Sequence, residues 1–292
     1  GRLQQPLRPN PLMSKRAPSE NRAPSNRPAK RGAAKAGLDE LLAAAGASRQ
    51  PGEGGGWAIA DAFRFRQQMT REAEADGFKE ELLAALSDEC FDPARLVALL
   101  RPTAGAAAVS SNDSIVRLLL HVDSLQPDIA SSLMQLLPEY QGEEASDAMT
   151  TTRLILSQFR WLEHIVDGAA LVGAASEMMQ VADAPLKREL LLVLPDLVQD
   201  GQHAAAADTL RSVLGEDTQF LASVLDAFGS LVLEPDALAE VCASVMDAVA
   251  GANVEDLPVV VRFLLQHMTK DSAKATVAAL RTGMQLDLLR GG

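Results

Sequence analysis

Cysteine and histidine are the side chains best suited to metal binding or nucleophilic catalysis, and in this chain they are few and scattered. They are Cys90, Cys242, His121, His164, His203 and His267. Zinc sites need ligands at short spacings such as Cys-x-x-Cys or His-Glu-x-x-His, and no such spacing occurs in the sequence. Cys90 follows Asp88 and Glu89, and neighbouring carboxylates raise the pKa of a thiol. These residues therefore predict neither a metal site nor a nucleophilic cysteine.

Other catalytic signatures are missing from the sequence as well. It has no phosphate-binding G-x-x-x-x-G-K-[ST] loop, no dinucleotide-binding G-x-G-x-x-G turn after a strand and no G-x-S-x-G nucleophile elbow. Paired acids such as Glu143-Glu144 and Glu216-Asp217 lie at the edges of expected helices. Carboxylates there are usual partners of a helix dipole. The sequence predicts a protein that is not an enzyme and needs no cofactor or small-molecule substrate.

Charge is divided unevenly along the 292 residues, which carry a net charge of −12. Residues 1–37 contain nine Lys or Arg and a single acid, Glu20, and so carry +8. Residues 38–292 therefore carry −20. Nucleic-acid binding by bulk electrostatics needs Lys and Arg against the phosphates. The acidic part is expected to meet proteins rather than DNA.

Residues 1–37 are expected to be a disordered basic tail, because they are rich in Pro, Arg and Ser and lack helical spacing of apolar residues. Their two basic clusters suit a bipartite nuclear import signal; the alternative is a solvated basic tail. The clustered residues are Lys15, Arg16, Lys30, Arg31 and Lys35. Met13 is the expected initiator, which would make residues 1–12 upstream sequence.

The pattern of apolar residues in the rest of the chain predicts consecutive helices. A short helix is expected over residues 38–46, followed by a flexible linker at Pro51–Gly56 and the main body from 57 to 292. Polar caps followed by proline mark helix starts, as in Asp92-Pro93 and Glu234-Pro235. We expect about 13 or 14 helices and no strand; the β-branched run Val259–Val261 continues with helical spacing.

Short loops between consecutive helices permit either a bundle or an α-solenoid. Nearly every helix keeps one polar and one apolar face, which favours an all-α solenoid of antiparallel helix pairs, HEAT- or armadillo-like. The last expected helix is apolar and lacks a polar cap, so the solenoid is expected to be truncated at its C-terminal end. No apolar run approaches membrane-spanning length, and no membrane partner is expected.

Several runs resemble, in order and spacing, the N-terminal helical region of the Fanconi anaemia group D2 family. They are SIVRLLLHVDSLQPDI (114–129), RLILSQFRWL (153–162), LPDL (194–197) and VEDLPVVVRFL (254–264). The similarity extends from about residue 57 to 289, and the basic start at Met13 is also similar. The chain is thus identified as the N-terminal portion of a family member.

The resemblance implies a large, non-enzymatic nuclear scaffold of DNA interstrand cross-link repair. Such a protein pairs with its paralogue, the Fanconi anaemia group I protein, and the pair clamps double-stranded DNA. A nuclear ubiquitin ligase complex attaches one ubiquitin, which locks the clamp. The acceptor lysine and most of the DNA-clamping surface are expected beyond residue 292.

The resemblance also implies a ubiquitin-binding element of CUE type between about residues 172 and 201. Its candidate contact residues are Pro185, Leu186, Leu190 and Leu191. The chain lacks the Met-Phe-Pro that such modules expose, and its leucines have the spacing of a solenoid core. The alternative is a helix pair buried against its neighbours.

Two other identities fit the same patterns. One is the group I paralogue, which has a similar solenoid; the other is an unrelated HEAT-like protein-interaction adaptor, whose basic tail would not direct nuclear import.

Overall fold

The computed structural model describes residues 37–51, 55–103, 113–142, 150–160, 162–199, 201–270 and 272–283. Fourteen α-helices, three short 3₁₀ helices and two strands lie within these ranges. The prediction of a mainly helical protein is confirmed. The basic tail expected over residues 1–37 lies outside the described ranges, except for Gly37.

The elements follow one another in this order: α1 Leu38–Ala43, β1 Ala47–Arg49, β2 Trp57–Ile59, α2 Ala62–Glu72, α3 Phe78–Cys90, α4 Pro93–Leu100, α5 Ile115–Leu120, α6 Gln126–Leu136, η1 Leu137–Tyr140, α7 Thr151–Ser157, α8 Gly168–Val181, α9 Ala184–Leu197, α10 His203–Glu216, η2 Thr218–Phe220, α11 Leu221–Phe228, α12 Pro235–Ala248, η3 Val249–Gly251, α13 Leu257–Gln266 and α14 Ala273–Gly283.

Local caps explain where several helices begin. The backbone N–H of Ala94 donates to the Asp92 carboxylate at 3.0 Å, and Pro93 occupies the first position of α4. The N–H of Leu186 donates to Asp183 at 2.9 Å in the same way at the start of α9. Each cap satisfies a backbone donor that has no partner inside its helix. The predicted starts at Asp92-Pro93 and Glu234-Pro235 are confirmed.

The prediction of no strand was wrong near the N-terminus. Strands β1 and β2 pair antiparallel, with Ala47 opposite Ile59 and Arg49 opposite Trp57. The buried side chains of Ala47, Trp57 and Ile59 join the same core as α1 and α2. The Arg49 guanidinium lies 4.8 Å from the centre of the Trp57 ring. Three-residue strands are too short to show alternation in the sequence, so tertiary packing decided this hairpin.

This hairpin also includes the described ends of the segment Pro51–Gly56, in which the flexible linker is expected. The N–H of Gln50 donates to the carbonyl of Gly56 at 2.7 Å, so the described residues at either end of this segment lie next to each other. Arg49 forms ion pairs of 2.9 Å with both Asp39 of α1 and Glu89 of α3. Residues 37–51 therefore belong to the same compact unit as the helices that follow.

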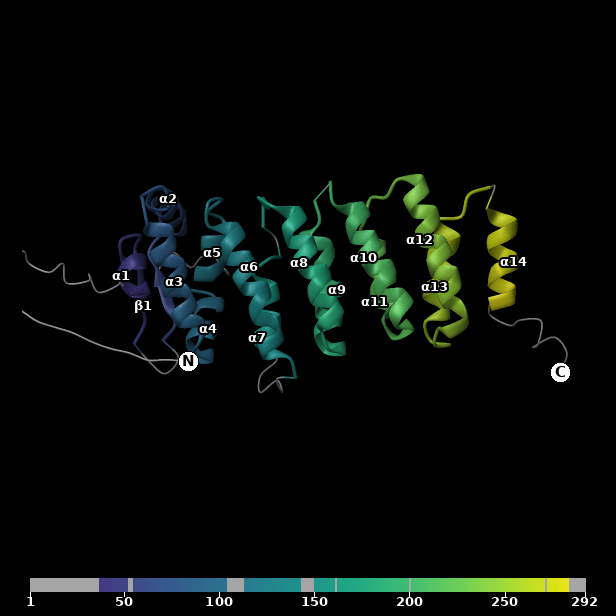
Figure 1. The fold of residues 1–292 in the computed structure, drawn as a ribbon, viewed down its shortest axis with the longest axis horizontal. Helices are drawn as coiled ribbons and strands as arrows, with labels where there is room; N and C mark the ends of the chain where they lie inside the picture. The colour runs from purple at the N-terminus through teal and green to yellow at the C-terminus, as the bar shows by residue number, and fades with distance from the viewer. Residues whose placement is uncertain are drawn as a thin grey trace, which may run out of the picture. The chain divides into compact units, whose positions relative to one another are not determined.

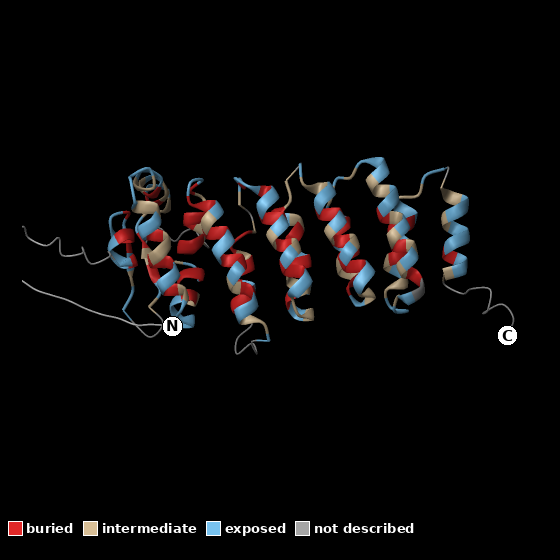
Figure 2. Ribbon diagram, in the orientation of Figure 1, coloured by how far each residue is buried: buried red, intermediate tan, exposed pale blue. Residues whose placement is uncertain are grey.

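From α6 onward, each helix contacts the helix two positions further along the chain. One series of contacts runs through α6, α8, α10, α12 and α14, and the other runs through α7, α9, α11 and α13. Figure 1 shows α8 to α13 as successive pairs, and Figure 2 shows their buried residues as stripes along the helices. The buried side chains join one continuous apolar core from Leu38 to Leu280. Each amphipathic helix thus buries its apolar stripe against its neighbours.

Candidate functional site

The predicted nuclear import residues cannot be placed in the fold. Lys15, Arg16, Lys30, Arg31 and Lys35 all lie outside the described residues. Their role stays a prediction from the sequence.

The predicted ubiquitin-contact residues lie on α9, but three of the four belong to the core. Leu186, Leu190 and Leu191 are 2%, 1% and 0% exposed, whereas Pro185 at the first turn is exposed. Helix α9 is packed against α7, α8 and α11. These three leucines fill space between helices and are themselves inaccessible to a partner. The fold thus favours the alternative interpretation, in which the segment is a packed helix pair.

Leu192, which the sequence reasoning did not single out, is 62% exposed on the same helix. It stands in the run Leu190-Leu191-Leu192-Val193, in which every residue is apolar. Periodicity cannot separate the buried from the exposed members of such a run. Only the direction in which α9 packs shows that Leu192 faces outward.

The two cysteines are half-buried and free. Burial, reinforced by the carboxylates of Glu89 and Glu139, raises the pKa of the Cys90 thiol to about 11. Burial also raises the pKa of Cys242. Cys90 is therefore almost wholly protonated at neutral pH, as its acidic neighbours predicted, although burial is the larger cause.

Side chains that could hold a metal do not converge in the described part of the chain. Within the described ranges, no three or more His, Cys, Asp or Glu side chains lie close enough together to hold a metal ion. No described helix is both long enough and apolar enough to span a membrane.

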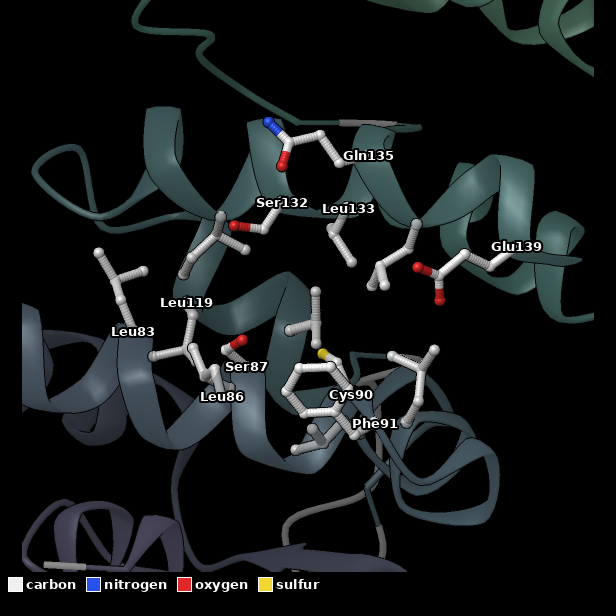
Figure 3. Close-up of a pocket in the computed structure, with 15 residues that line it drawn as sticks. Leu83, Leu86, Ser87, Cys90, Phe91, Leu119, Ser132, Leu133, Gln135 and Glu139 are labelled. Carbon is white, nitrogen blue, oxygen red and sulfur yellow. The ribbon is translucent and has the colours of Figure 1, made fainter. Parts of the chain in front are cut away.

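A pocket of about 330 Å³ lies between α3 and α6, and we call it the α3–α6 pocket. Helix α3 lines it at 83, 86, 87 and 90, and α6 lines it at 129, 132, 133, 135 and 136. Spacings of three and four residues place such side chains on one face of a helix. The pocket therefore has two helical walls that face each other (Figure 3).

Core residues from the two intervening helices complete the α3–α6 pocket. Leu96 and Leu99 of α4 and Leu119 of α5 are fully buried beneath it. Phe91, at the rim, is 83% exposed. Glu139 is the one charged side chain among the described lining residues, and Figure 3 shows it at the end of the pocket away from Leu83.

An ion pair joins the two walls just before the first lining residue of each, Leu83 on α3 and Ile129 on α6. Lys79 Nζ of α3 lies 2.6 Å from Asp128 Oδ2 of α6. Partly exposed pairs contribute little to stability, but this one adds a contact that spans the gap between the walls. The pocket is an opening between packed helices, with apolar chemistry inside and one carboxylate at its rim.

The fold and this pocket define a mainly α-helical protein whose consecutive amphipathic helices pack on one another. Residues 62–289 match the family model described as "Fanconi anaemia protein FancD2 nuclease". The chain therefore belongs to the FancD2 family. This confirms the family resemblance found in the sequence.

Curated relatives agree with this assignment. The chain is similar to the Fanconi anemia group D2 protein homolog of Rattus norvegicus, with 36% identity over 169 residues, covering 58% of this chain. It is similar to the Mus musculus homolog, with 34% identity over 59% of this chain. It is also similar to the Gallus gallus protein, with 28% identity over 85% of this chain. The chain spans only 12% to 18% of the length of these relatives.

Proposed function

We propose that this chain is the N-terminal part of a non-enzymatic nuclear scaffold of DNA interstrand cross-link repair. The observation that carries the proposal is membership of the FancD2 family over residues 62–289. In this proposal the whole protein pairs with the Fanconi anaemia group I protein and holds double-stranded DNA. A nuclear ligase complex attaches ubiquitin to a lysine outside this chain.

The proposed architecture is an α-solenoid. It is supported by the two series of contacts between alternate helices, since stacked repeats contact mainly their neighbours. Such packing presents long lateral surfaces made of many helices. Docking of partners on those surfaces is the proposed mechanism.

The charge distribution supports protein partners for this part of the molecule. Residues 38–292 carry −20, which disfavours a polyanion and attracts basic protein surfaces. We therefore assign DNA contact mainly to parts of the longer protein that this chain does not include.

Direct pairing can be tested by mixing the 292-residue chain with purified Fanconi anaemia group I protein and measuring co-elution by gel filtration. We expect a shared peak for the mixture. An unrelated acidic helical-repeat protein is the matched control and should elute separately. Separate elution of this chain would contradict the proposal that its surfaces dock the paralogue.

Nuclear localisation is proposed from the basic tail. Residues 13–37 fused to a fluorescent protein should direct it to the nucleus. Alanine at Lys15, Arg16, Lys30, Arg31 and Lys35 should abolish import, whereas alanine at Arg22 and Arg27 should leave it largely intact. A cytoplasmic signal from the unchanged fusion would favour the HEAT-like adaptor instead.

Ubiquitin binding, if the α9 segment performs it, must use residues other than its buried leucines. Pro185 and Leu192 are the exposed apolar residues of that helix. Titration of isotope-labelled ubiquitin with the chain tests this, with Leu192→Asp as the variant and Leu265→Asp on α13, also exposed, as the control. Absence of shifts with the unchanged chain would end the ubiquitin assignment.

A nuclease is the second candidate, because the description of the family model contains that word. Phosphodiester hydrolysis commonly uses metal ions held by carboxylates or histidines. Incubating the chain with end-labelled duplex and flapped DNA in Mg²⁺ or Mn²⁺ tests this activity. The scaffold proposal predicts intact DNA, and cleavage that survives repurification of the chain would favour the nuclease.

A further inference from the structure

We propose that the α3–α6 pocket docks a short amphipathic helix of a partner protein. Apolar side chains of that helix enter the pocket, and a Lys or Arg at one end pairs with Glu139. This inference rests on the proposed scaffold function and names one docking site for it.

The interior of the pocket is suited to apolar side chains. Its floor consists of fully buried leucines from α4 and α5, and its walls add Leu83, Ile129 and Leu133. Removing apolar surface from water contributes about 25 cal/mol per Å². Because the leucines of the floor are already shielded from water, this contribution would come from the surface of the incoming anchor and from the partly exposed Leu83 and Leu136.

Phe91 extends the apolar surface beyond the pocket. It follows the last residue of α3, lines the pocket and is 83% exposed. Aromatic side chains in partly desolvated pockets are typical anchors of protein–protein interfaces. A ligand lying along the pocket would cover this ring as well as the interior.

The dimensions of the pocket fit a short helix. Its α3 wall runs from Leu83 to Cys90, which is about 10 Å or two turns at 1.5 Å per residue. Both walls present side chains three and four residues apart. An incoming helix with apolar residues at the same spacings can place its stripe between them, as in helix-in-groove recognition.

The carboxylate at the rim of the pocket favours a partner helix that carries a positive charge at one end. Glu139 is exposed at the rim, and no described cation forms an ion pair with it. A cationic residue would complement this carboxylate, and the −20 body would attract a basic segment from a distance. A second copy of this chain is a poorer occupant, because two acidic bodies repel each other.

The test uses the full 292-residue chain and a displayed library of random 14-residue peptides as the probe. We expect enrichment of peptides with apolar residues at i, i+3 or i+4, and i+7, together with Lys or Arg near one end. Repeating the selection on Glu139→Lys should enrich acidic residues at that end instead.

Affinity of an enriched peptide is then measured by fluorescence anisotropy on variants of exposed positions. Phe91→Ser removes the aromatic ring at the rim, and Ser132→Trp obstructs the opening of the pocket. Each should weaken binding of the peptide at least tenfold. Phe63→Ser is the matched control, because Phe63 is also an exposed phenylalanine but lies on α2. Circular dichroism checks that each variant keeps its helix content.

Cys90 provides a readout inside the pocket, and Cys242 provides an internal control. The bound peptide should slow alkylation of Cys90 at least fivefold and leave Cys242 unchanged. No enrichment, an unchanged affinity for Ser132→Trp, or equal alkylation of Cys90 with and without peptide would each overturn the proposal. Pairing with the group I protein is measured separately by gel filtration. If that pairing fails, the peptide-binding and alkylation results still decide whether the pocket docks a helix.

Discussion

Leu191 and Leu192 are adjacent leucines in α9 with opposite environments. Leu191 is buried in the core, and Leu192 faces outward. One residue turns an α-helix by about 100°, so neighbours in a helix face different directions. At the residue scale, the direction of each side chain therefore decides whether it stabilises the fold or remains available to a partner.

Substitution of these two leucines should separate the roles. Leu191→Ala should lower the free energy of unfolding by about 2–5 kcal/mol, because it removes buried methyl groups and leaves a cavity. Leu192→Ala should change it by less than about 0.5 kcal/mol. Urea denaturation followed by circular dichroism measures both. Equal losses would contradict the placement of α9.

Cys90 should show a displaced pH dependence of alkylation. With a thiol pKa of about 11, the thiolate fraction rises roughly tenfold per pH unit from pH 7.5 to 10. Iodoacetamide labelling of a Cys242→Ser variant, followed by mass spectrometry, should therefore accelerate throughout this range. A plateau near pH 9, as in an unfolded cysteine control, would contradict this environment.

Elements of this protein are joined by side chains that bond to the backbone of distant segments. The buried Gln126, at the start of α6, donates from Nε2 to the carbonyls of Leu120 and His164, both at 2.8 Å. Its Oε1 accepts from the N–H of Val166 at 2.6 Å. One amide thus links α5, α6 and the segment before α8, and supplies partners for backbone groups that caps do not reach.

Gln126→Leu should test this link, because it keeps a similar volume and removes all three bonds. We expect a loss of about 3 kcal/mol in unfolding free energy, since three backbone groups would lose a partner. Gln135→Leu is the matched control at an exposed position of α6 and should be nearly neutral. Losses of the same size in both variants would argue against the linking role.

The whole molecule combines a +8 tail with a −20 helical body. Any duplex binding by this chain should therefore depend on the tail and weaken steeply with salt. At the scale of the whole chain, the net charge of −12 describes neither part and predicts partners poorly.

Fluorescence anisotropy with a 30-base-pair duplex tests that division. Weak binding at 50 mM salt should disappear at 200 mM salt, because counterion release drives it. The variant with alanine at Lys15, Arg16, Lys30, Arg31 and Lys35 should bind at least tenfold more weakly even at 50 mM. Binding that is unaffected by this variant would place a DNA-contacting surface on the helical body.

Helix content, several helix starts and the family were predictable from the sequence alone. Apolar residues at spacings of three and four, and carboxylates before proline, act within a few residues of one another, so the sequence shows them directly. Charge division and missing catalytic motifs are likewise properties of composition and short spacing.

Tertiary structure decided the features that depend on distant residues. The β1–β2 hairpin exists because Trp57 and Ile59 join a core with α1 and α2, and three-residue strands carry no pattern of their own. The α3–α6 pocket needs side chains from residue 83 to residue 139. The exposure of Leu192 follows from the direction in which α9 packs. Local chemistry determines which segments become helices, whereas their mutual packing determines which surfaces remain open to partners.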